Sequence, residues 1–73
     1  MHFELWGVQS GNLIARCATD VEAYSIVRGL LAAGWDPKDL LLSAEHDPDE
    51  PPDAPLPPLL EGAALQERAH QYA

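Results

Sequence analysis

A chain of 73 residues forms one domain at most, and a domain of this size buries only about 60% of its unfolded surface, so we expect a partner or a second copy to assist folding. The net charge of −8 argues against direct binding to nucleic acid or anionic lipid and leaves a basic protein partner open. The chain shows no signal peptide and no run of about 18 apolar residues, and its one cysteine excludes an internal disulfide, so we expect a protein of the reducing cytoplasm.

The first two predicted elements form a β-hairpin. Residues 2–8 alternate in polarity, which places Phe3 and Leu5 on one face of a strand and Trp6 on the other. A short turn follows, with a Gly-Asn pair that tolerates positive φ. Residues 13–18 then return as the second strand.

A helix is predicted next. Thr19 and Glu22 fit a capping box, in which the Thr hydroxyl accepts from a backbone N–H and the Glu carboxylate reaches back to the cap. Apolar residues repeat at intervals of three and four: Ala23, Ile26, Val27, Leu30 and Leu31. Gly34 is well placed for a left-handed cap at the end of this helix.

A short connector leads to a third strand. Pro37 prevents continuation of the helix and Asp36 can cap the turn that begins there, while Trp35 is expected to close the end of the core. Residues 40–44 form an apolar run broken only by Ser43, and its lack of alternation favours a strand that is buried on both faces or covered on its outer face.

These elements predict an α+β domain over residues 1–45, with a ββαβ unit and a three-stranded sheet in spatial order 2-1-3. The helix would cover one face of the sheet. The opposite face carries Trp6, which is therefore a candidate interface residue. Either the C-terminal tail or a second copy of the sheet could cover it, and the sequence leaves both open.

Residues 46–58 form a predicted linker that holds six of the seven prolines, and its first eight residues carry four acids and no base. We expect an extended, polyproline-like spacer. Its acids would keep the loop solvated or offer a docking strip to a basic partner.

Residues 59–73 are predicted to form a short amphipathic helix or tail. Its interface candidates lie along one side: Leu65, Ala69 and Tyr72. This tail could dock on its own domain or on another chain.

Each possible chemical site lacks something that its chemistry requires. The linker residues that could surround a hard cation lie in a loop stiffened by proline and without glycine: His46, Asp47, Asp49, Glu50 and Asp53. Cys17 with a histidine (His2, His46 or His70) could form a nucleophile and base, but a small buried residue is the simpler interpretation. Asp36 and Asp39 are better explained by capping than by acid–base chemistry. We predict no catalytic residue, no cofactor and no metal, and thus no enzyme.

Several short motifs span residues 3–42: F-E-L-W in the first strand, S-G-N-L-I through the hairpin, T-x-x-E-A into the helix and G-W-D-P-x-D-L after it. In these motifs the chain resembles a type of small bacterial protein, and the resemblance implies no function. In element order it is also similar to the ββαβ domain of HicB-type antitoxins, a likeness of fold that no diagnostic residues accompany.

Two functions of different classes follow. The first is a non-catalytic module for protein interaction or self-association. The second is an acidic, antitoxin-like inhibitor or regulator that binds a basic protein partner.

Overall fold

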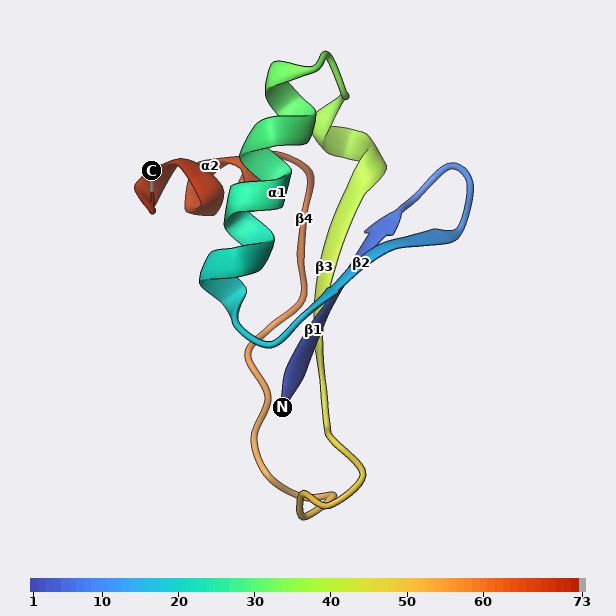
Figure 1. Ribbon diagram of the computed structural model, residues 1–73, viewed down its shortest axis with the longest axis vertical. Helices are drawn as coiled ribbons and strands as arrows, with labels where there is room; N and C mark the ends of the chain where they lie inside the picture. Colours follow the sequence, from blue (N-terminus) through green and yellow to red (C-terminus); the bar gives the residue numbers. More distant parts are fainter. Residues whose placement is uncertain (73) are drawn as a thin grey trace.

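The computed structural model describes residues 1–72, which form an antiparallel four-stranded sheet and two α-helices in an α+β architecture (Figure 1). In chain order the elements are β1 (His2–Gly7), β2 (Asn12–Cys17), α1 (Asp20–Ala32), the 3-10 turn η1 (Pro37–Asp39), β3 (Leu40–Glu45), β4 (Leu60–Glu61) and α2 (Gly62–Gln71).

The strands follow the spatial order β2-β1-β3-β4, so the predicted order 2-1-3 is correct for the first three strands and incomplete as a description of the sheet. The fourth strand pairs with β3 through Leu41 opposite Glu61 and Leu42 opposite Leu60. Two residues are too few to show an alternating pattern, so the sequence gives no sign of this strand. It forms because the long loop returns the chain to the free edge of β3.

The hairpin matches its prediction. Gly11 adopts φ +67° in the turn, and its N–H donates to the Gly7 carbonyl at 2.9 Å. Phe3 pairs with Cys17 and Trp6 with Leu13, while the register shifts between Leu5 and Trp6. One extra residue on β2 is accommodated there as a β-bulge, which increases local twist.

The helix α1 begins and ends as predicted. Thr19 Oγ1 accepts from the Glu22 N–H at 3.2 Å, although the Glu22 carboxylate accepts from the Thr19 hydroxyl rather than reaching the cap N–H. Gly34 ends the helix at φ +102°. Trp35 is 43% exposed, so the expectation that it closes the core is wrong.

Both helices pack on one face of the sheet (Figure 1). The core joins Phe3 and Leu5 of β1 and Leu42 of β3 to Val27 of α1 and Leu65 of α2. The possibility that the tail covers the Trp6 face is therefore wrong. A strand alternates its side chains between faces, and α2 joins the face that α1 already makes apolar.

Residues 46–58 form a loop that turns back on itself at one end of the molecule (Figure 1). The Glu50 N–H donates to the Asp47 carbonyl at 3.0 Å, and the Ala54 N–H donates to the Pro51 carbonyl at 3.1 Å. The loop thus returns the chain to β3, and residues 59–72 join the same core as residues 1–45. Within residues 1–72, neither helix is long and apolar enough to cross a membrane.

Candidate functional site

The face of the sheet opposite the helices is the candidate site, and we call it the open face. Its central row follows from strand register: Trp6 on β1 pairs with Leu13 on β2 and with Leu41 on β3. Paired residues in adjacent strands share a face, so the three side chains lie side by side. Trp6 and Leu41 are half-buried, and Leu13 is 41% exposed.

A polar row lies beside this apolar row. Glu4 on β1 pairs with Arg16 on β2 and with Ser43 on β3. The Arg16 Nη2 donates to Glu4 Oε2 at 3.0 Å, yet the Arg16 side chain remains 64% exposed. Glu45, two residues after Ser43, is exposed at the end of β3. The open face therefore has an apolar centre and a charged margin.

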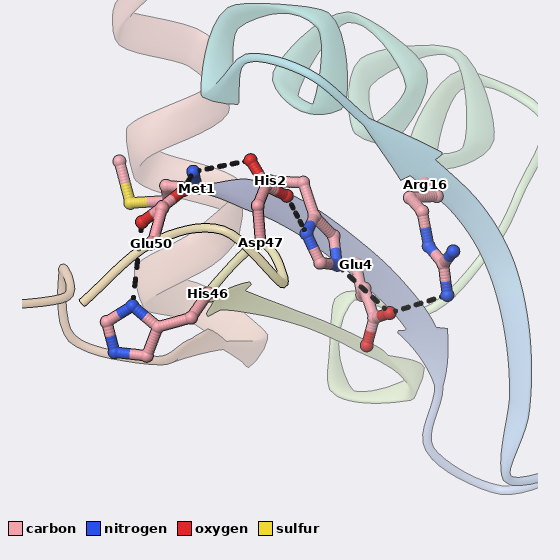
Figure 2. A network of polar contacts seen from close by, with 7 residues as sticks. All are labelled: Met1, His2, Glu4, Arg16, His46, Asp47 and Glu50. Atoms are coloured by element: carbon pink, nitrogen blue, oxygen red, sulfur yellow. Dashed lines mark hydrogen bonds and ion pairs between the residues drawn. The ribbon is translucent and has the colours of Figure 1, made fainter. Parts of the chain in front are cut away.

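A network of polar contacts ties the first strand to the loop at this margin (Figure 2). His2 bridges two carboxylates, with Nδ1 2.7 Å from Asp47 Oδ1 and Nε2 3.3 Å from Glu4 Oε2. The amino group of Met1 donates to Asp47 Oδ2 at 2.7 Å and also contacts Glu50. Asp47 thus holds the start of the loop against the start of β1.

The network changes the acidity of one group. Hydrogen bonds from the Met1 amino group and from His2 lower the pKa of Asp47 below its ordinary value. This carboxylate therefore stays ionised at the edge of the open face, and its contacts are those of a structural tie. His46, on the same loop, lies 3.5 Å from Glu50 through Nδ1.

The linker residues considered as metal ligands do not assemble into a cluster. Asp47 and Glu50 face the Met1 amino group, while Asp49 and Asp53 are exposed. Within residues 1–72, no group of three His, Cys, Asp or Glu side chains is placed to hold a metal ion.

Cys17 is buried on the helix-covered face of β2. Burial, with the nearby charge of Glu22, raises the pKa of the Cys17 thiol, so the nucleophilic thiolate is disfavoured. Its neighbours in the core are apolar, as expected for a small packing residue.

The paired acids of the connector have separate local contacts. Asp36 caps η1, and its Oδ1 accepts from the Lys38 N–H at 2.9 Å, as the capping interpretation predicts. The Asp39 N–H donates to the Asp36 carbonyl at 2.9 Å, and its own carbonyl accepts from Val8 at 2.7 Å.

The three candidates on α2 and at its C-terminal cap have different surroundings from Trp6. Leu65 and Ala69 are buried in the chain's own core, so α2 docks on its own domain. Tyr72 stacks on Tyr24, with ring centroids 5.0 Å apart, and the Arg28 guanidinium donates to the Ala69 carbonyl at 2.8 Å. The apolar side of this helix is thus occupied within one chain.

The sequence alone placed Trp6 on the face away from the first helix, but it did not place Leu13 and Leu41 beside it. Leu13 and Leu41 could have been found by extending the alternation from Trp6 across both flanking strands. The apolar run of β3 concealed Leu41, because the run predicts burial on both faces. In fact Leu40 and Leu42 are buried and Leu41 is half-buried on the open face.

Two surface hollows are small. One lies between the loop and α1, has a volume of about 100 Å³ and includes Tyr24, Pro57 and Arg68 in its lining. The other measures about 190 Å³ and lies beside Ser10 and Trp35. Sites for drug-sized ligands usually exceed about 300 Å³, so the open face is the stronger candidate.

Comparison with protein-family models, with curated proteins and with solved structures finds no match to this chain.

Proposed function

We propose that this chain is a non-catalytic protein-interaction module that binds its partner through the open face. The row formed by Leu13, Trp6 and Leu41 carries the proposal, because it is the apolar centre of a sheet face that neither helix covers. Tryptophan at the centre of an apolar patch with a polar rim is typical of protein interfaces.

The surroundings of the row support this function. Val8, just after β1, and Leu59, just before β4, are both exposed and extend the apolar surface of the chain. Charged residues lie around the three apolar side chains: Glu4 and Arg16 are paired beside the row, and the exposed Glu61 on the edge strand β4 follows Leu41 at its end. A partner would therefore desolvate apolar side chains first and leave the charges at the rim.

The single buried thiol of Cys17 supports a place in the reducing cytoplasm for this module. We propose proteins as its partners, and neither nucleic acid nor membrane, because a net charge of −8 repels phosphates and anionic lipid.

A second candidate function is that of an acidic inhibitor that binds a basic protein. The loop favours it, since Asp49 and Asp53 are exposed and form no ion pair within residues 1–72. A basic partner would be encoded beside this chain if the likeness to HicB-type antitoxins extends to function.

Photo-cross-linking in the native cells separates these candidates. A benzophenone amino acid replaces Leu13 on the open face, Asp53 on the loop or Val21 on α1, which is a control because it is exposed on the opposite side of the sheet. We expect protein adducts from position 13 and not from position 21. Adducts from position 53 alone would favour the acidic inhibitor, and no adduct from position 13 would refute the interaction module.

A further inference from the structure

The open face is self-complementary about an axis that runs along β1. This strand is flanked by β2 on one side and by β3 on the other, and the two residues of β4 lie outside β3. Trp6 has a leucine as neighbour on each flank, Leu13 and Leu41. Rotation by 180° about a line parallel to β1 generates a second sheet packed face to face with the first, so that β2 of each copy lies opposite β3 of the other. Each row of side chains then lies opposite the same row of the second copy.

We infer that the partner seated on the open face is a second copy of this chain, related by a two-fold axis that lies in the interface along β1. This inference rests on the proposed interaction function and names its partner. In this arrangement Leu13 of each copy lies against Leu41 of the other, and the two Trp6 side chains meet at the centre. Two-fold symmetry of this kind is the commonest in homo-oligomers.

The charges favour the same arrangement. The half-turn brings Arg16 of one copy over Ser43 of the other, within reach of Glu45 two residues farther along β3. Arg16 contacts Glu4 through one guanidinium nitrogen and is otherwise solvated, so it can bind a second carboxylate. Glu45 has no ion-pair partner within residues 1–72. Glu4 opposes its own copy, and its carboxylate is held by Arg16 of the same chain.

The size of the open face predicts a weak dimer. Three strands of six residues, at ~3.3 Å per residue and ~4.8 Å between strands, make a patch of roughly 20 by 15 Å. At roughly 300 Å² on each copy, this patch is smaller than the ~800 Å² per partner of a standard interface, so we expect weak association, at the upper end of the micromolar range. Sheets that pack face to face cross at about 30°, which requires the axis to be inclined by about 15° to β1.

The first test is the mass of the full-length chain in solution, measured by light scattering from low micromolar to submillimolar concentration. We expect the mass to rise from one chain toward two. Leu13→Glu should weaken association by at least about tenfold, because it places a charge in the apolar row. The matched control is Val21→Glu, at a position 48% exposed on α1, and it should leave association unchanged. Circular dichroism confirms that each variant is folded.

A charge exchange tests the axis itself. Arg16→Glu and Glu45→Arg each place like charges together in a homodimer, and each should weaken self-association. When the two variants are mixed, every Arg faces a Glu across the heterodimer, so association should return. An arrangement in which each residue faces its own copy already opposes like charges in the wild type, so it does not predict that each variant alone weakens association.

Each outcome has a definite meaning. A wild-type dimer that Leu13→Glu disrupts, together with rescue by mixing, supports the inference. Disruption without rescue overturns the axis along β1. A wild-type chain that stays monomeric overturns the second copy as partner. The interaction function would then still be tested by the adducts at position 13, where a foreign protein would take the place of the second copy.

Discussion

The two faces of one sheet differ in this molecule although the same strands build both. On the covered face, Leu5 and Leu42 are sealed beneath α1 and α2, whereas on the open face Trp6 and Leu41 keep part of their surface in water. Alternation alone gives each face an apolar centre. The two faces differ because both helices pack on one side of the sheet and neither covers the other side.

The largest expected loss of stability comes from a substitution on the covered face. Leu5→Ala should lower the free energy of unfolding by about 2–5 kcal/mol, since it leaves a cavity in the centre of the core. Leu13→Ala, a matched change on the open face, should cost less than about 1 kcal/mol in the monomer. Urea unfolding at a concentration that keeps the chain monomeric measures both. Equal losses would mean that the two faces are equally buried.

The next effect concerns the second covering helix. Leu65→Ala should lower the free energy of unfolding by about 2–3 kcal/mol, the lower half of the range for buried leucine, because α2 is only ten residues long and can settle into the space. Leu59→Ala, at an exposed position just before β4, is the control and should cost less than about 0.5 kcal/mol. Hydrogen exchange should show faster opening of α2 in Leu65→Ala only, and unchanged protection would place α2 outside the core.

A smaller effect tests the start of the first covering helix. Thr19→Ala removes the acceptor for the Glu22 N–H and should lower stability by about 1 kcal/mol. Thr19→Ser keeps that acceptor and should behave like the wild type. Thermal unfolding of the three proteins distinguishes the lost hydrogen bond from the lost methyl group, which would instead weaken both variants alike.

The smallest effect tests the tie between the open face and the loop. The pKa of Asp47 is lowered in the folded state, so its ionised form stabilises the fold above the unfolded pKa of about 3.9. That contribution is lost as the pH falls through the lower, folded pKa. Asp47→Asn should therefore have a smaller free energy of unfolding than the wild type at pH 7, and this difference should shrink below about pH 4.

Urea unfolding midpoints of both proteins across this pH range measure the difference in stability between Asp47→Asn and the wild type. Asp49→Asn is the control, since Asp49 is exposed in the same loop and contacts neither Met1 nor His2. A stability difference between Asp47→Asn and the wild type that is independent of pH would show that the Asp47 carboxylate does not act through its charge.

Much of this fold is local and was predicted on that ground. The hairpin turn, the Thr19 cap, the Gly34 terminus and the Asp36 cap each depend on residues within a few positions of one another. Their hydrogen bonds form wherever those residues occur in that order. Trp6 was found in the same way, by alternation within one strand.

Other features depend on distant segments and could not be predicted. Tyr24 is buried because α2 and Tyr72 cover it, a contact that the helical pattern of α1 does not show. His2 contacts Asp47 because the loop turns back beside β1, across 45 positions of sequence. Such contacts depend on how distant segments of the chain pack together, and local conformational preferences do not determine them.

The sequence by itself determined the α+β class, the ββαβ order over residues 1–45 and the placement of Trp6 away from the first helix. Only the tertiary structure decided that β4 would lengthen the sheet, that α2 would join α1 and that Leu13 and Leu41 would flank Trp6. The physical reason is that a strand's pattern fixes which residues share a face, whereas packing of the whole chain fixes which face is covered.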